Sequence, residues 1–143
     1  MSAMQLKRFL AALALAGVSW SATAQDVVPV VGARSPIASL DATQVADIFL
    51  GKTSRFPDGS IALPVDQGEG SPLREKFYAQ FAGKSPAQVK AYWSKIIFTG
   101  RGQPPRQAAD STEVKRIVSD NPHAIGYIDA KQVDSSVRVL AAR

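Results

Sequence analysis

The sequence predicts an α/β fold, in which a single compact domain holds a mostly parallel sheet flanked by helices. Two observations carry this prediction. Short runs of β-branched residues alternate with amphipathic stretches, and each amphipathic stretch begins at a residue that caps helices well. The expected order is one strand, one helix, one strand, three helices and two strands. Such alternation favours parallel pairing through right-handed crossovers, and 143 residues are enough for one domain.

Four short apolar segments are predicted to form the strands. The first is Val-Val-Pro-Val-Val-Gly at residues 27–32, where Pro29 indicates an edge or the start of a strand. The others are residues 61–65, 124–128 and 137–141.

Four helices are predicted from their caps and their apolar spacing. The caps are Asp41, Ser71, Ser85 and Asp110, and a proline follows each of the two serines at the first helical position. Gly51, Gly83 and Asn121-Pro122 mark helix ends. The side chains expected to face the core are Val45, Ile48, Phe49, Leu73, Phe77, Tyr78, Phe81, Val89, Tyr92, Trp93, Ile96, Ile97, Val114, Ile117 and Val118.

Residues 1–24 are predicted to be a cleaved secretory signal peptide. Lys7 and Arg8 precede an apolar stretch at residues 9–18, and Ala22-Thr23-Ala24 matches a small-residue cleavage site. The mature domain would then be residues 25–143, with 15 basic and 12 acidic side chains. No apolar run reaches the roughly 18–20 residues that a membrane-spanning helix needs. An exported chain without cysteine is typical of a bacterial periplasmic protein.

The composition excludes several classes of function. There is no cysteine, so disulfide frameworks and thiol catalysis are excluded. His123 is the one histidine, so a multi-histidine metal site is excluded, and no nucleophile motif accompanies it. The positive charge is too diffuse for nucleic-acid binding. We therefore expect neither an enzyme nor a cofactor-binding protein.

The most informative segment for function is residues 64–74, where a strand leads through a glycine-rich turn into a helix. Open α/β sheets bind ligands outside the carboxyl ends of their strands, and a helix N-terminus favours an anion. Arg74 lies in the first turn, where a cation opposes the helix dipole unless something negative is close. The alternative is that Gly70 and Ser71 only cap the helix and that Arg74 is solvated.

Other residues leave two interpretations open. Asp66 and Glu69 are either a carboxylate pair or solvated turn residues. Arg101 and Arg106 either face a cleft or solvate a loop. The aromatic pair at residues 92–93 either packs in the core, which its helical spacing favours, or stacks on a ligand.

Several segments, in their order and spacing, resemble the substrate-binding proteins of phosphate ABC transporters. They are residues 39–52 with Ile-Phe-Leu-Gly-Lys at the end, the turn at residues 55–59, residues 70–77, residues 98–100 and residues 124–127. The resemblance covers roughly residues 30–130 and is greatest to short, single-lobe members. It implies one lobe of a type II periplasmic binding protein, because the chain is too short for the two complete lobes that close on phosphate.

The resemblance also implies a ligand site, with departures from the family pattern. Residues 70–73 correspond to the family's Gly-Ser-Gly-Thr phosphate loop, but Pro72 replaces the glycine and Leu73 replaces the threonine. Gln67 stands where the family often has arginine. Each lost charge-assisted hydrogen bond costs about 1.5–3 kcal/mol. The implied ligand-binding residues are Gly70, Ser71, Gln67 and the N–H groups of Leu73 and Arg74.

Two functions follow from this sequence. The first is a periplasmic solute-binding protein for phosphate or a related small oxyanion, which passes its ligand to a membrane transporter or sensor. The alternative is a degenerate lobe that binds another periplasmic protein without an anion. A second copy of the chain could complete the half-cleft, and the sequence leaves the oligomeric state open.

Overall fold

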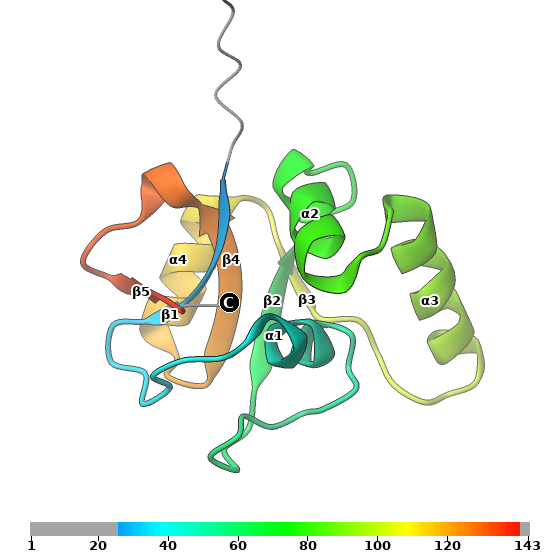
Figure 1. The fold of residues 1–143 in the computed structure, drawn as a ribbon, viewed down its shortest axis with the longest axis horizontal. Helices are drawn as coiled ribbons and strands as arrows, with labels where there is room; N and C mark the ends of the chain where they lie inside the picture. The colour runs from blue at the N-terminus through cyan, green and yellow to red at the C-terminus, as the bar shows by residue number, and fades with distance from the viewer. Residues whose placement is uncertain (1–25, 141–143) are drawn as a thin grey trace, which may run out of the picture.

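The computed structural model describes residues 26–140 as one layered α/β domain (Figure 1). The predicted leader and its cleavage site lie outside the described residues. The strands are β1 (Val27–Gly32), β2 (Leu63–Gln67), β3 (Arg106–Ala108), β4 (Ala124–Asp129) and β5 (Val137–Val139). The helices are α1 (Ala42–Phe49), α2 (Pro72–Phe77), α3 (Pro86–Phe98) and α4 (Ser111–Asp120), with a π-helical turn η2 (Tyr78–Ala82) after α2 and a 3-10 turn η3 (Ala130–Gln132) after β4.

The five strands form one mixed sheet in the order β3-β2-β4-β1-β5. β2 pairs in parallel with β3 and β4, whereas β1 pairs antiparallel with β4 and β5. The predicted α/β domain is confirmed, but its parallel pairing is confined to the β3-β2-β4 half. β3 was not among the predicted strands, and β2 covers residues 63–67 rather than 61–65. Ala141, at the end of the predicted last strand, lies outside the described residues.

The two faces of the sheet carry separate halves of the core. α1 and α2 cover the face toward the viewer in Figure 1, and α4 covers the face behind it. Side chains alternate between these faces along β4, so that Ile125 and Tyr127 pack under α1 and α2, while Ala124 and Ile128 pack under α4. All six residues of β4 are buried, as expected for a central strand covered on both faces.

The predicted caps form as hydrogen bonds that fix the helix starts. The side chains of Asp41 and Ser85 each accept the N–H three residues later, and in both cases a glutamine returns a bond to the cap, which completes a capping box. Ser71 and Asp110 also accept the N–H of the third residue of their helices. The caps therefore decide where four helices begin.

α3 is the outermost helix on the side of the molecule where β2 and β3 lie (Figure 1). Only Val89 and Trp93 of this helix are buried, and the Tyr92 hydroxyl donates to the Leu50 carbonyl at 2.6 Å. The prediction that Ile97 faces the core is wrong, since 53% of this residue is exposed. The helix extends past the core, so Ile97 and Phe98 at its end are exposed. Within residues 26–140, no helix is long and apolar enough to cross a membrane.

Two glycines allow α4 to lie close against the sheet. A Cβ at Gly32 would collide with the backbone carbonyl of Val118, and a Cβ at Gly126 would collide with the side chain of Val114.

Gly32→Ala is therefore expected to lower the melting temperature by several degrees, because α4 must move away from β1. The measurement is thermal unfolding followed by circular dichroism. Gly102→Ala is the matched control, since its added Cβ meets only the Ile96 side chain at an ordinary 3.6 Å. Equal melting temperatures for the two variants would contradict this account of the packing.

Candidate functional site

The predicted site lies at the carboxyl edge of the parallel strands. β2 ends at Gln67, the chain turns through residues 68–70, and α2 begins after Ser71. Gly70 has φ +86°, a left-handed conformation that a residue without Cβ adopts at no steric cost. The strand, turn and helix are therefore arranged as the sequence predicts for a ligand-binding edge of an α/β sheet.

A buried carboxylate lies directly behind this loop. Asp66 is 2% exposed, and its oxygens accept hydrogen bonds from the hydroxyls of Tyr78, at 2.5 Å, and Tyr127. The backbone N–H of Gln67 also donates to Asp66 Oδ1 at 2.8 Å and to the Tyr127 hydroxyl at 3.1 Å. Burial, and then the charge of Asp66, raises the pKa of both tyrosines well above the usual value for a phenol. Both hydroxyls therefore remain protonated donors.

Gln67 and Ser71 bond to each other. Ser71 Oγ donates to Gln67 Oε1 at 2.9 Å and accepts the N–H of Arg74 at 3.3 Å. Gln67 Nε2 donates to the Tyr127 carbonyl at 3.2 Å and to Ser111 Oγ at 3.4 Å. Ser111 is the first residue of α4 and also accepts the N–H of Asp129. Two of the predicted ligand-binding side chains thus join β2, α2, α4 and β4.

Arg74 is a largely buried cation beside this network. Its side chain is 11% exposed, and its Nε lies 3.6 Å from Asp66 Oδ1. The guanidinium carbon lies 5.3 Å from the centre of the Tyr78 ring, a cation–π arrangement. Arg74 Nε is buried and has no hydrogen-bond acceptor among the described residues. A guanidinium in this position is oriented by the protein and still has donor capacity.

A cavity of about 190 Å³ opens beside Arg74, between the loop, α2 and the start of α3. Its charged lining consists of Arg74 and Lys90 against Glu69 and Glu75. The remaining lining residues are Gly70, Tyr78, Pro86, Ala87 and Val89. Within residues 26–140, no group of three His, Asp or Glu side chains could hold a metal ion.

The structure brings together only part of the predicted site. Gly70 and Arg74 line the cavity, whereas the side chains of Gln67 and Leu73 are buried away from it and the Ser71 hydroxyl is bonded to Gln67. Asp66 and Glu69 do not form a carboxylate pair, because Asp66 is buried against two tyrosines and Arg74. Of the two residues, only Glu69 is exposed as a solvated turn residue would be.

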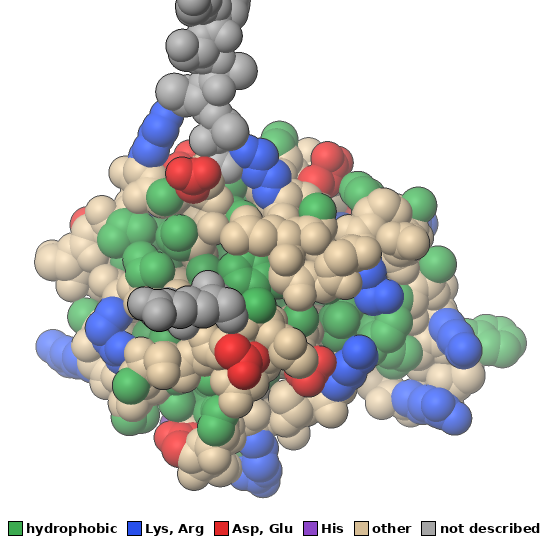
Figure 2. Space-filling view, viewed as in Figure 1, with side chains coloured by type: hydrophobic (Ala, Val, Ile, Leu, Met, Phe, Trp, Pro, Cys, Tyr) green, Lys and Arg blue, Asp and Glu red, His purple; other side chains and the backbone are tan. Residues whose placement is uncertain are grey.

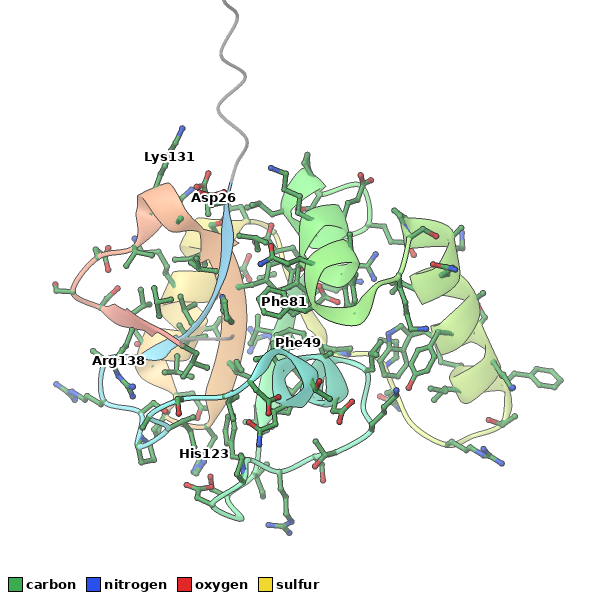
Figure 3. All side chains as sticks on the ribbon, viewed as in Figure 1. Asp26, Phe49, Phe81, His123, Lys131 and Arg138 are labelled. Atoms are coloured by element: carbon green, nitrogen blue, oxygen red, sulfur yellow. The ribbon has the colours of Figure 1, made fainter. Side chains whose placement is uncertain are left out.

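The other candidates lie elsewhere. His123 is exposed at the end of the sheet where β4 begins (Figure 3), away from the β2–α2 loop. Trp93 packs in the core, and Arg101 and Arg106 are exposed near α3. Sequence reasoning missed the polar roles of Tyr78 and Tyr127. A carboxylate placed at the end of an apolar strand was the signal that buried donors would be needed.

Comparison with solved structures identifies similar folds. A protein described as a phosphate ABC transporter substrate-binding protein, with bound phosphate, from Clostridium perfringens matches 82% of this chain and 45% of its own, with a TM-score of 0.64 and 23% identity. An ABC-type phosphate transport receptor from Vibrio cholerae matches 82% of this chain and 46% of its own, with a TM-score of 0.64 and 19% identity.

PstS from Borrelia burgdorferi matches 83% of this chain and 47% of its own, with a TM-score of 0.63 and 13% identity. The chain shares its fold with one half of each of these proteins. It spans less than half of their length, and at these identities the likeness concerns the fold alone. The sequence matches no protein-family model, and no curated protein is significantly similar to it.

The hydrogen bonds of Asp66 make a prediction about stability. Tyr127→Phe keeps the ring, which stacks on Phe77 at 4.1 Å between ring centres, but it removes a donor to Asp66 and an acceptor for the Gln67 N–H. Because two buried polar groups lose a partner, the free energy of unfolding should fall by about 1–3 kcal/mol. Urea unfolding measures this change. An unchanged free energy would show that the Asp66 cluster does not stabilise the fold.

Proposed function

We propose that this protein is an exported solute-binding lobe that binds phosphate or a related small oxyanion beside the loop between β2 and α2. Arg74 is the observation that carries the proposal, because Asp66 and Tyr78 hold this guanidinium in place at the wall of the cavity. A planar guanidinium binds the oxygens of phosphate and sulfate well, because it presents several donors in a fixed geometry.

The surrounding groups would set the affinity and the selectivity. Lys90 offers a second cation from the far wall, while Glu69 and Glu75 reduce the positive charge of the cavity. Asp66 offsets much of the charge of Arg74. With these carboxylates nearby, the site should bind an anion more weakly than Arg74 alone would. Of the ligand-binding residues that the family resemblance implies, Gly70 and Arg74 line the cavity.

The predicted leader at residues 1–24 suggests where the protein would act. Residues 1–24 would direct the chain to the periplasm and be removed there, and the mature domain would begin at Gln25. The bound oxyanion would then be passed to a membrane transporter or to a sensor.

A second function is favoured by a different observation. The Ser71 hydroxyl and the Gln67 amide are bonded to each other and not to the cavity. A lobe whose polar loop serves its own fold is suited to act as an interaction module that binds another periplasmic protein without an anion. The same fold can serve either function, since function depends on the site and not on the fold.

Titration calorimetry of the purified protein with phosphate, with sulfate as the second ligand, tests the first function. We expect binding in the micromolar range, and we expect Arg74→Gln to weaken it at least tenfold, because a charge-assisted hydrogen bond contributes about 1.5–3 kcal/mol. Lys90→Gln should weaken binding less, and it leaves Asp66 paired. Lys52→Gln removes a charge from an exposed position outside the cavity and is the matched control.

Two results would contradict the oxyanion function. One is the absence of heat and of any shift in melting temperature at millimolar phosphate. The other is binding that falls equally in Lys52→Gln and in the two cavity variants, since this would reflect net charge and not a site. Melting temperatures of all variants separate lost binding from lost folding.

A further inference from the structure

A second hollow lies at the opposite end of β2 from Arg74. Two adjoining cavities of about 340 and 610 Å³ lie between α3, the end of α1, the start of β2 and the loop at residues 99–105. Both are lined by Ile48, Gly51, Pro64, Trp93 and Gln103. We call this hollow the α3 groove. Its size is in the range of ligand-binding sites, and it shares no lining residue with the cavity beside Arg74.

Trp93 is a buried wall residue of the α3 groove. The residue is 6% exposed and lines both cavities, yet its Nε1 is buried without a hydrogen-bond partner among the described residues. An indole N–H is only a donor, and a buried donor is normally paired. A bound group with a carbonyl or carboxylate oxygen at this point would satisfy it.

The charge of the α3 groove has one sign. Lys95, Arg101 and Arg106 line its two cavities, and neither lining contains Asp or Glu. No ion pair within residues 26–140 involves any of these three cations. Figure 2 shows Lys and Arg side chains on the α3 side of the molecule, with hydrophobic side chains among them. An acidic occupant therefore complements the groove.

The apolar surface continues beyond the cavities. Leu63 lines the smaller cavity and is 44% exposed. At the end of α3, Ile97 and Phe98 are 53% and 92% exposed, and Phe98 directly precedes Thr99, which lines the larger cavity. Exposed aromatic and aliphatic side chains at the mouth of a groove are typical of surfaces that bind another protein. This continuation favours a protein segment over a small molecule.

We propose that the α3 groove docks an acidic segment of a partner protein. An apolar side chain of that segment occupies the hollow beside Trp93, an oxygen accepts the Trp93 Nε1 hydrogen, and Asp or Glu side chains face Arg101 and Arg106. The proposal deepens the interaction function and rests on it. It is independent of the oxyanion site beside Arg74.

A displayed library of random peptides, selected against the purified protein, tests the proposal. The recovered peptides should combine Asp or Glu with an apolar residue, and they should shift the fluorescence of Trp93. Their affinity should fall at least tenfold in the double variant Arg101→Glu/Arg106→Glu. The matched control is Arg34→Glu/Lys131→Glu, which changes the net charge equally at exposed positions outside the groove.

The outcomes separate this proposal from the functions above. Peptides that bind the groove variant and the control variant equally would overturn the α3 groove while leaving an interaction function elsewhere on the surface. Failure to enrich any peptide would overturn the α3 groove as a docking site, while a partner that binds another face of the lobe would leave the interaction function standing. Phosphate titration of the groove variant should match the unaltered protein, because Arg74 is unchanged. Equal melting temperatures of the two double variants show that both remain folded.

Discussion

The burial of one carboxylate, Asp66, constrains much of this structure. An ion taken out of water is strongly unfavourable unless hydrogen bonds and opposite charge replace its hydration. Here the replacement comes from a π-helical turn, from the central strand β4 and from the first turn of α2, through Tyr78, Tyr127 and Arg74. The carboxylate therefore fixes the end of β2 relative to three other elements. The same contacts hold Arg74 where it can face a ligand.

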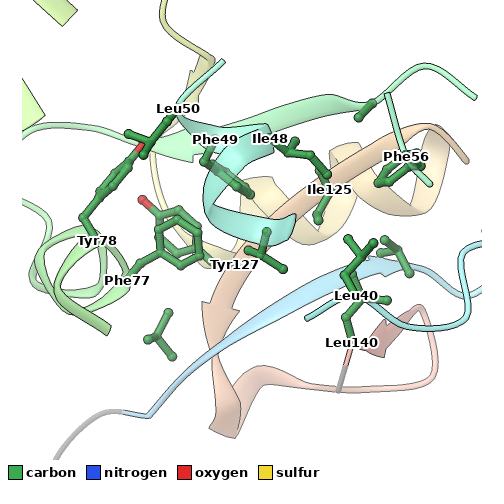
Figure 4. Packing of buried hydrophobic residues seen from close by; sticks show 14 of the residues in the cluster. Leu40, Ile48, Phe49, Leu50, Phe56, Phe77, Tyr78, Ile125, Tyr127 and Leu140 are labelled. Atoms are coloured by element: carbon green, nitrogen blue, oxygen red, sulfur yellow. The ribbon is translucent and has the colours of Figure 1, made fainter. Parts of the chain in front are cut away.

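Aromatic side chains pack beside the hydrogen-bonded cluster around Asp66. Figure 4 shows Phe49 of α1 close to Phe77 and Tyr127, and the Phe77 and Tyr127 rings stack with an interplanar angle of 7°. The stack packs the ring of Tyr127, whose hydroxyl donates to the buried Asp66. Because burial raises the pKa of both tyrosines, their hydroxyls are protonated donors at neutral pH. Tyr127 thus belongs both to the aromatic stack and to the hydrogen bonds of Asp66.

Local sequence signals predicted the helix starts and most of the strands. Caps such as Asp41 and Ser85 act within three residues, so they can be recognised without knowledge of the fold. β3 was missed because Arg-Gln-Ala has no apolar alternation and forms a strand only by pairing with β2. The antiparallel pairing of β1 and β5 depends likewise on distant partners. The sequence signals that Asp66 needs buried donors but not which ones, since its tyrosine partners lie 12 and 61 residues away in sequence.

The two ends of β2 present different chemistry. The carboxyl end presents an oriented guanidinium beside a small cavity, and the amino end presents a larger apolar groove whose cations form no ion pair with the described residues. The central claim is that Arg74 holds a small oxyanion, and a crystal structure grown with phosphate tests it most directly. We expect a tetrahedral anion within hydrogen-bond distance of the Arg74 guanidinium, beside Gly70. A phosphate-soaked structure with no anion in this cavity, and with Arg74 paired only with Asp66, would contradict this expectation.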